Sequence, residues 1–167
     1  EVVRGDTGNN VLSAAGGADT IYGGSGNDTL YAASIDYMSG GASSDNADDN
    51  LYGEAGNDIL IASAGDNILD GGTGADTITS GSGSDTIVLR VGDGGSTLVD
   101  ADTITDFTDG SDKLGMDDNL QFSQLTIAQG TYSNSNDTII SKGSEYLAIL
   151  TGIDASVLSE ADFTPVD

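Results

Sequence analysis

An aspartate or asparagine recurs at every ninth position through the first half of this chain, with one interruption. The column consists of Asn10, Asp19, Asp28, Asp49, Asp58, Asn67, Asp76 and Asp85. Carboxylate and carbonyl oxygens are hard ligands, and in the absence of sulfur and imidazole they select calcium. Magnesium fits less well, because it keeps its water and demands octahedral geometry. The column therefore predicts rows of calcium sites.

The charge of the chain points to bound cations as well. The 167 residues include 28 acidic and 4 basic residues, which gives a formal net charge of −24. Such a chain repels itself when compact, so cations are needed to offset the charge. The same charge excludes nucleic acid and anionic membrane as partners. The chain has no cysteine and no histidine, which excludes thiol catalysis, Ser-His-Asp hydrolysis and the usual zinc sites.

Two further columns define the elements that must position the aspartates. Position 8 of each nine-residue unit is always Leu or Ile, and position 4 is Gly in every unit except one, where it is Ala47. One large aliphatic residue in nine cannot form a helix face, which needs apolar residues three and four apart. A very short strand around position 8 and a turn rich in Gly and Asp fit the pattern. Two units make a coil of about 18 residues, and the coils stack into a parallel solenoid.

This stacking predicts which aspartates align. Consecutive units lie on opposite sides of the coil, so alternate units superpose. One edge is expected to carry Asn10, Asp28, Asp58 and Asp76, and the other Asp19, Asp49, Asn67 and Asp85. Carboxylates stacked about 4.7–4.9 Å apart repel one another unless a cation lies between them. We expect roughly six to eight calcium ions, about one for each stacked pair of turns.

The unit that contains Asp49 is interrupted. Residues 47–52 supply its second half, and its first half is either 32–34 or 44–46, with about a dozen residues looped out. We place this looped insertion at about 32–46. Tyr22, Tyr31 and Tyr52 recur at position 9, where they either pack on the surface or offer a platform for a sugar.

The units GGSGNDTLY (23–31) and GGTGADTIT (71–79) resemble the nonapeptide repeats of the RTX family, the repeats-in-toxin or hemolysin-type calcium-binding proteins. The resemblance implies that position-6 side chains and backbone carbonyls of early turn positions share each calcium between stacked turns. The implied carbonyls are those of Gly23, Ser25, Gly53, Ala55, Gly71, Thr73, Ser80 and Ser82. Asn10 and Asn67 depart from the family pattern, and their lower charge predicts weaker sites.

The second half resembles the end of such proteins. Residues 102–107 and 110–114 are similar to the segment that follows the repeats in secreted RTX proteases and alginate epimerase modules. This resemblance implies that Asp93 and Asp102 close the last calcium sites. Residues 150–163 resemble the C-terminal end of type I secretion substrates. Thr138–Ser141 and Glu145–Leu150 predict a hairpin.

The predicted fold is all-β: a parallel β-roll, or calcium-bound β-solenoid, over residues 1–88, with a β-rich C-terminal unit over 89–167 packed on it as a cap. We expect a monomeric, non-catalytic calcium-binding module of a larger secreted or cell-surface bacterial protein. It is expected to be unfolded at low calcium, to fold after export by the type I secretion machinery, and not to insert into membranes. The alternatives are a surface-binding module for adhesion, carbohydrate or ice, and an accessory domain of an upstream secreted enzyme. Since the chain starts at Glu1 without an apolar leader, we expect it to be part of a longer protein.

Overall fold

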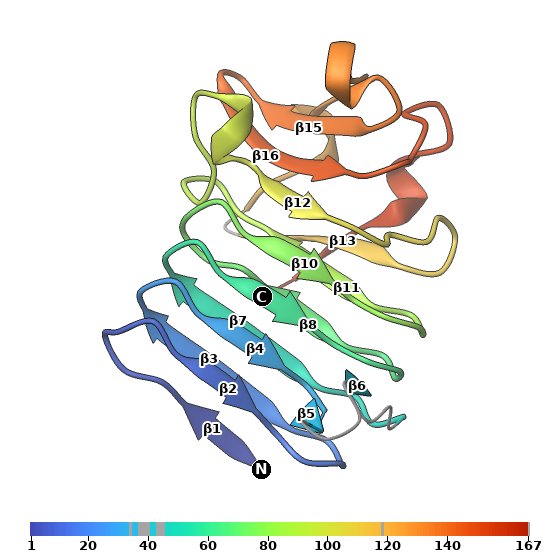
Figure 1. The fold of residues 1–167 in the computed structure, drawn as a ribbon. Helices are drawn as coiled ribbons and strands as arrows, with labels where there is room; N and C mark the ends of the chain where they lie inside the picture. Colours follow the sequence, from blue (N-terminus) through green and yellow to red (C-terminus); the bar gives the residue numbers. More distant parts are fainter. Residues whose placement is uncertain (34, 37–40, 43–45, 118, 167) are drawn as a thin grey trace.

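The computed structural model describes residues 1–33, 35–36, 41–42, 46–117 and 119–166. The chain winds upward in stacked coils, and each coil places one short strand in each of two facing sheets (Figure 1). The strands of the roll pair in parallel, and position 8 of one coil lies beside position 8 of the next, as in the pair Leu51 and Leu69. The predicted all-β, parallel β-roll is confirmed.

The first sheet has seven strands in the order β1-β3-β7-β9-β11-β13-β17. Their bounds are Val2–Arg4, Thr20–Ser25, Asn50–Ala55, Ile68–Asp70, Thr86–Leu89, Lys113–Met116 and Phe163–Pro165. All the pairs in this sheet are parallel. These seven strands thus follow one another up one face of the roll.

The second sheet has eight strands in the order β14-β15-β16-β12-β10-β8-β4-β2. Taken from β2 upward through β4, β8, β10, β12, β16, β15 and β14, their bounds are Val11–Ser13, Thr29–Tyr31, Ile59–Ile61, Thr77–Thr79, Asp102–Ile104, Glu145–Leu150, Thr138–Lys142 and Thr126–Gln129. The pairs from β2 to β16 are parallel, whereas β14, β15 and β16 pair antiparallel. The predicted hairpin is therefore present as β15 and β16.

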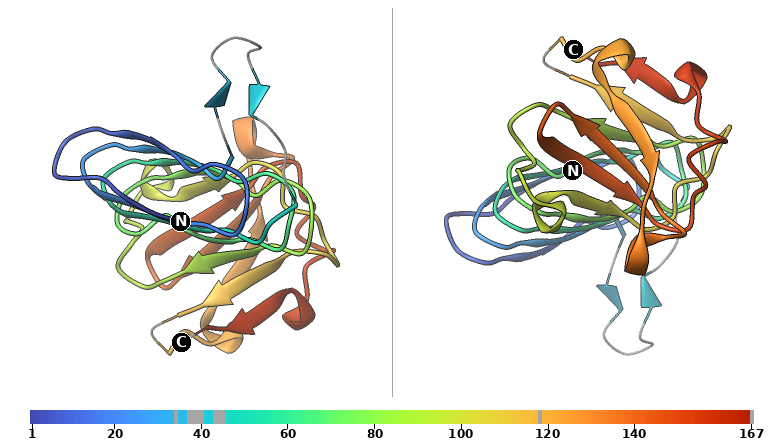
Figure 2. Two further views of the ribbon diagram at one scale, coloured as in Figure 1. Left: turned by 90° about the horizontal axis from the view of Figure 1, so that it is seen from below. Right: turned by 90° about the horizontal axis from the view of Figure 1, so that it is seen from above.

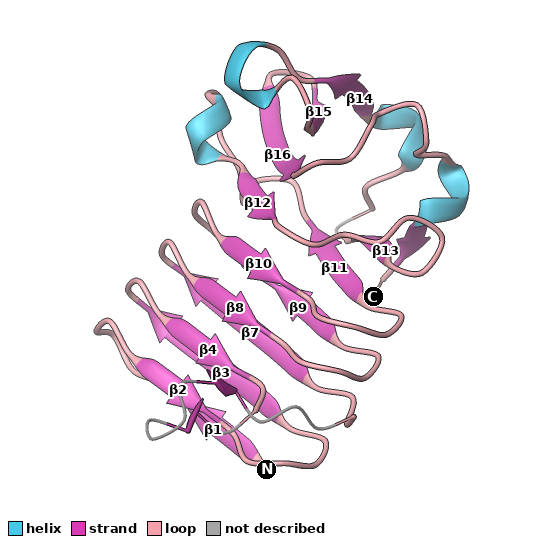
Figure 3. Cartoon of the chain, turned by 45° about the vertical axis from the view of Figure 1, so that its right-hand side comes forward, coloured by secondary structure: helices cyan, strands magenta, loops and turns pink. Residues whose placement is uncertain are grey.

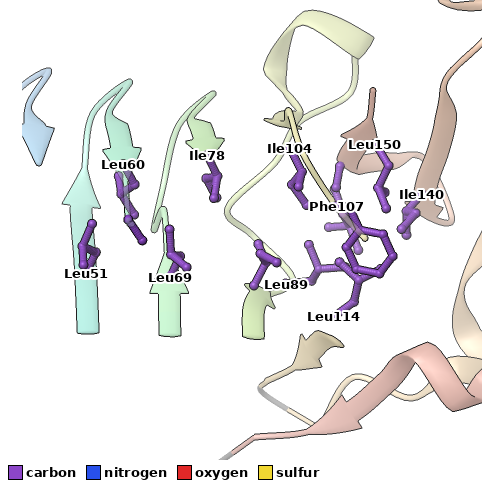
Figure 4. Close-up of a cluster of buried hydrophobic side chains, with 14 of the residues drawn as sticks. Leu51, Leu60, Leu69, Ile78, Leu89, Ile104, Phe107, Leu114, Ile140 and Leu150 are labelled. Carbon is purple, nitrogen blue, oxygen red and sulfur yellow. The ribbon is translucent and has the colours of Figure 1, made fainter. Parts of the chain in front are cut away.

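The core of the roll is a double row of single aliphatic side chains. In the three-residue strands β4, β8, β9 and β10 the middle residue is the buried one, and the position-8 residues from Ile21 to Ile87 are fully buried. Figure 4 shows Leu51 and Leu69 on one sheet facing Leu60 and Ile78 on the other. Burying one such side chain contributes about 1.5–3 kcal/mol. Because each coil adds only two of them, a coil depends on its neighbours for stability.

The interrupted coil keeps its place in the stack. The amide of Ala32 donates to the carbonyl of Ile61 at 3.0 Å, just as Ala14 donates to Tyr31. Ala32 is therefore the first residue of its unit, which favours 32–34 over 44–46 as the first half; residues 34 and 44–45 lie outside the described residues. Within the insertion, β5 (Ile35–Asp36) and β6 (Gly41–Ala42) pair antiparallel and project from the side of the roll (Figure 2).

The C-terminal unit continues both sheets and widens the core. Strands β12 and β16 extend the second sheet, and β13 extends the first (Figure 3). Strand β17 then pairs with β13. Phe107, Leu114, Ile140, Leu150 and Phe163 are buried between them. Four single-turn 3-10 helices connect these strands: η1 (Leu98–Asp100), η2 (Phe122–Gln124), η3 (Tyr132–Asn134) and η4 (Glu160–Asp162). In the described part of the chain, no helix has the length and apolar character needed to span a membrane.

Candidate metal centre

The position-6 side chains of alternate units form the first of the two predicted rows. In this first row each carboxylate accepts the amide of the position-6 residue one coil below. Asp28 Oδ1 accepts from Asn10 at 2.8 Å, Asp58 Oδ1 from Asp28 at 2.7 Å, and Asp76 Oδ1 from Asp58 at 2.7 Å. Asp102 continues the row, since its Oδ1 accepts from Asp76 at 3.0 Å.

The second row runs along the opposite edge of the roll and follows the same rule. Asp49 accepts from Asp19 at 2.8 Å, Asn67 from Asp49 at 2.9 Å, and Asp85 from Asn67 at 2.8 Å, each through Oδ1. Asp112 Oδ1 extends the row by accepting from the Asp85 amide at 3.1 Å. Both rows arise because parallel pairing at position 8 fixes the height of position 6 two residues earlier.

The second carboxylate oxygen of these aspartates is the feature that demands a cation. Oδ2 of Asp19, Asp28, Asp58, Asp76 and Asp85 is buried and has no hydrogen-bond partner among the described residues. Burying a charged oxygen without a partner costs several kcal/mol or more, so native proteins pair such atoms or neutralise them. Oxygen-binding cations between successive turns of each row would satisfy these atoms.

Backbone carbonyls converge on the same places. A Cβ added to Gly23 would lie 2.6 Å from both Asp28 Oδ2 and the Gly53 carbonyl oxygen. A Cβ on Gly53 would collide with Asp58 Oδ2 and the carbonyl of Gly71. Among the described residues, no group of three or more acidic side chains is arranged so that it could hold a metal ion by itself. One or two carboxylates with carbonyls from the adjacent turns therefore form the donor set, and this hard, all-oxygen set fits calcium.

Burial also disfavours the charge on these carboxylates when no cation is present. It raises the pKa of Asp76 to about 7, against an ordinary value of 3.8, and the nearby Asp58 charge adds to this effect. The pKa values of Asp58 and Asp85 rise to about 6, again chiefly through burial. The pKa of Asp102 is raised as well, by burial first and by the Asp76 charge second. A positive charge at the rows would favour the ionised forms.

Comparison with known proteins shows to which repeat family the turns that carry these rows belong. The sequence matches the RTX calcium-binding nonapeptide repeat in four copies, over residues 1–30, 43–78, 52–87 and 61–95. The chain belongs to the RTX calcium-binding repeat family. RTX repeats bind calcium, in agreement with the donor set found here. No curated protein showed significant similarity to the chain.

Two solved structures share the fold of this RTX chain. The solution structure of the AlgE6R2 subunit of the Azotobacter vinelandii mannuronan C5-epimerase is 20% identical, with a TM-score of 0.54 over 98% of this chain and 91% of that one. The crystal structure of the extracellular lipase LipA from Serratia marcescens is 18% identical, with a TM-score of 0.51 over 98% of this chain. The chain spans 38% of the lipase. At these identities the likeness concerns the β-roll fold.

The carbonyls that the resemblance implied as ligands occupy two positions of the RTX turns. Gly23, Gly53, Gly71 and Ser80 begin their turns, and their carbonyls face the adjacent coil. Ser25, Ala55, Thr73 and Ser82 stand at the third position. The carbonyls of Ala55, Thr73 and Ser82 each accept the amide of a fourth-position glycine one coil below, at 2.8–3.0 Å. Since a carbonyl oxygen has two lone pairs, one remains for a metal.

Asp93 and Asp102 take different places in the fifth turn of the first row. The Asp93 carbonyl accepts the Gly74 amide at 3.1 Å, which makes Asp93 the third residue of its turn. Its carboxylate lies 3.0 Å from the guanidinium of Arg90, which also contacts Asp70 at 2.9 Å and Asp117 at 2.6 Å. Asp102, by contrast, holds the sixth position. The two residues thus close the row with a carbonyl and a carboxylate, respectively.

Sequence reasoning missed two features of the rows. Asp112 is the sixth residue of the last turn of the second row, and the order Asp112-Lys113-Leu114 repeats positions 6 to 8 of a unit, which could have revealed it. The second feature is an outer ladder of exposed position-5 side chains. Asn9 Oδ1 accepts the Asn27 amide, and Asn27 Oδ1 accepts the Asn57 amide, both at 3.0 Å.

Two of the tyrosines at position 9, Tyr22 and Tyr52, pack on each other. The rings of Tyr22 and Tyr52 stack with their centroids 5.0 Å apart and their planes 13° apart. The guanidinium of Arg4 lies 3.9 Å from the Tyr22 ring centroid. Both faces of the Tyr22 ring and one face of the Tyr52 ring are therefore covered within the protein, which favours the packing interpretation over a sugar platform at these two positions.

Proposed function

We propose that this chain is the calcium-dependent folding module of a larger secreted bacterial protein. The observation that carries the proposal is the alignment of buried carboxylates in two rows with unpartnered Oδ2 atoms. Bound calcium supplies the positive charge that these rows need. At low calcium the stacked carboxylates repel one another, and the slender aliphatic core cannot hold the coils together.

The coupling between metal and fold gives the module its role. An extended chain suits passage through a narrow export channel, and calcium in the millimolar range outside the cell then favours folding. The extracellular lipase among the structural relatives supports this location. We propose the type I secretion machinery as the partner during export and roughly six to eight ions as the calcium content.

The C-terminal unit acts as the cap in this proposal. Strand β16 covers β12, and β17 covers β13, so the last coil of the roll does not end in two exposed strand edges. The antiparallel strands β15 and β14 then close the second sheet. Folding that starts at this exported end would also oppose back-sliding through the channel.

The module itself is proposed to be non-catalytic. Most aspartates of the repeats are engaged in the two rows, and the chain has neither histidine nor cysteine for acid–base or nucleophilic chemistry. Its structural relatives are parts of an epimerase and a lipase. An accessory domain of a secreted enzyme is therefore one form that the larger protein could take.

A calcium titration followed by circular dichroism tests the proposal. The chelated chain should show a coil spectrum and convert cooperatively to a β spectrum as free calcium rises. Magnesium at the same concentrations serves as the control and should leave the spectrum unchanged. A chain that keeps its full β signal after exhaustive chelation would refute the proposal.

The export part has its own test. Translocation is measured in cells that secrete a protein carrying this chain at its C-terminal end. The rates are compared with and without calcium in the medium. The proposal expects faster and more complete export with calcium. Equal rates in both media would remove the idea that folding outside the cell opposes back-sliding, while leaving calcium-dependent folding intact.

A further inference from the structure

Asn67 is the buried member of the second row that carries an amide in place of a carboxylate. It is 1% exposed, and its stacking contacts match those of the aspartates. Its Oδ1 accepts the Asp49 amide at 2.9 Å, and its own amide donates to Asp85 Oδ1 at 2.8 Å. The difference lies in the second side-chain atom, which is a nitrogen in Asn67 and an unpartnered Oδ2 in Asp19, Asp28, Asp58, Asp76 and Asp85.

This nitrogen is fully engaged. Asn67 Nδ2 donates to the Asp85 carboxylate Oδ1 at 3.0 Å, to the Gly65 carbonyl at 3.2 Å and to the Ser80 carbonyl at 3.4 Å. The Gly65 oxygen belongs to the fourth position of the turn that contains Asn67. The Ser80 and Asp85 oxygens belong to the first and sixth positions of the next turn in the same row. By the repeat, the same positions surround Oδ2 of each aspartate. The amide hydrogens of Asn67 thus point where other turns need a cation.

The amide cannot simply rotate to offer its oxygen instead. A flip would place Nδ2 against the backbone N–H of Asp49, so two donors would face each other. The Asp49 amide would then be buried without an acceptor, which costs about 1–3 kcal/mol. The backbone of the coil below therefore fixes the orientation of Asn67.

Asn10 provides a contrast within the same sequence. Its Oδ1 accepts the Asp6 amide at 2.8 Å, and its Nδ2 lies 3.2 Å from Asp6 Oδ1, so both groups are used inside its own turn. The substitution of Asp by Asn at position 6 does not by itself create donors toward the next coil. The arrangement at Asn67 depends on its place between two coils.

We propose, building on calcium-dependent folding, that the step between turns 62–67 and 80–85 holds no calcium because the Asn67 amide takes over the role of the ion. The N–H groups satisfy the carbonyls and the Asp85 carboxylate that a cation would otherwise bind. The second row is then divided into two calcium-binding parts by one metal-free step. The first row, with Asp28, Asp58 and Asp76, has no such step.

The test compares calcium stoichiometry in three variants of the full chain, measured by equilibrium dialysis with radioactive calcium at saturating free calcium. N67D should bind one more ion than the parent chain, and D58N, which installs the same amide in the first row, should bind one fewer. N57D is the matched control, since Asn57 is exposed and its Oδ1 accepts the Ala75 amide in the outer ladder. It adds the same charge without a buried site and should not change the stoichiometry.

The outcomes separate this inference from the proposed function. Circular dichroism verifies that each variant is folded at saturating calcium. A folded N67D or a folded D58N with the parent stoichiometry would overturn the inference, and D58N decides alone if N67D does not fold. A parent chain that binds no calcium would instead refute the proposed function. A gain in N67D and a loss in D58N with N57D unchanged would establish the metal-free step.

Discussion

Removing the carboxylate of Asp76 is the sharpest perturbation of the rows. Its Oδ1 accepts the Asp58 amide at 2.7 Å, its Oδ2 is buried without a partner, and the residue is 1% exposed. In Asp76→Ala both oxygens disappear. The Asp58 amide loses its acceptor, and the steps below and above Asp76 each lose an oxygen.

The magnitude follows from the hydrogen bond and the number of ions. A buried amide left without an acceptor costs about 1–3 kcal/mol. If folding takes up about six ions, its free energy changes by about six RT for each e-fold change in calcium, so this cost raises the calcium midpoint about 1.3- to 2.3-fold. The lost ligands add to this shift. They also lower the number of ions taken up on folding, which sets the slope of the transition, by about one to two.

The assay is the circular dichroism titration at controlled free calcium, fitted for midpoint and slope. Asp66→Ala is the control, because Asp66 accepts the Ser84 amide at 2.8 Å but is exposed in the outer ladder. Its midpoint should move less than about 1.3-fold, and its slope should stay unchanged. If Asp76→Ala kept the midpoint and slope of the parent chain, the assignment of ligands to the rows would be wrong.

Three other perturbations probe the charge, the core and the turn. Burial raises the pKa of Asp76 from 3.8 to about 7, so the metal-free fold binds a proton that the unfolded chain releases. The contribution of this proton to the stability of the metal-free fold is fully present below about pH 4 and is lost as the pH rises through 7, so the chelated chain should show more β signal at pH 5 than at pH 8. Leu69→Ala should lower the free energy of unfolding in saturating calcium by about 2–5 kcal/mol, measured by urea titration. The control is Ile68→Ala, because the neighbouring Ile68 is 39% exposed. An equal loss in both variants would contradict the position-8 core. Gly53→Ala places a Cβ against Asp58 Oδ2 and the carbonyl of Gly71, so it should raise the calcium midpoint. In the control Gly8→Ala the nearest atom lies 3.4 Å from the added Cβ, so the midpoint should not change. Equal midpoints in the two variants would contradict the close packing of Gly53 against these oxygens.

The roll could be predicted from sequence because its contacts repeat at a fixed spacing. The same three columns define the strand, the turn and the aspartate row, so one register fixes them all. The separation of 18 residues between stacked partners such as Asp49 and Asn67 is the predicted coil length. Across the insertion the separation between Asp28 and Asp58 is 30, in line with about a dozen looped residues.

The remaining features depend on contacts that no short period encodes. The Arg90 guanidinium joins Asp70, Asp93 and Asp117 from three levels of the stack, and nothing near Arg90 in sequence specifies two of them. The parallel pairing of β13 with β17 joins residues about fifty apart. The amide of Asn67 is a third case, because its role depends on which atoms surround it in the adjacent coil.

The side excursion at β5 and β6 has a consequence for how the roll tolerates change. The chain leaves the turn after Ala33 and rejoins it at Asn46, yet Ala32 and Asp49 keep hydrogen bonds in register with the coils on either side. The fifth turn of the first row is also lengthened, by η1 between Asp93 and Asp102, and its backbone rejoins the stack in the same way. The middle of a turn is thus free in length, whereas its first and sixth positions are not. A guest peptide grafted at this point would be displayed beside the roll while the coils beneath it keep their spacing.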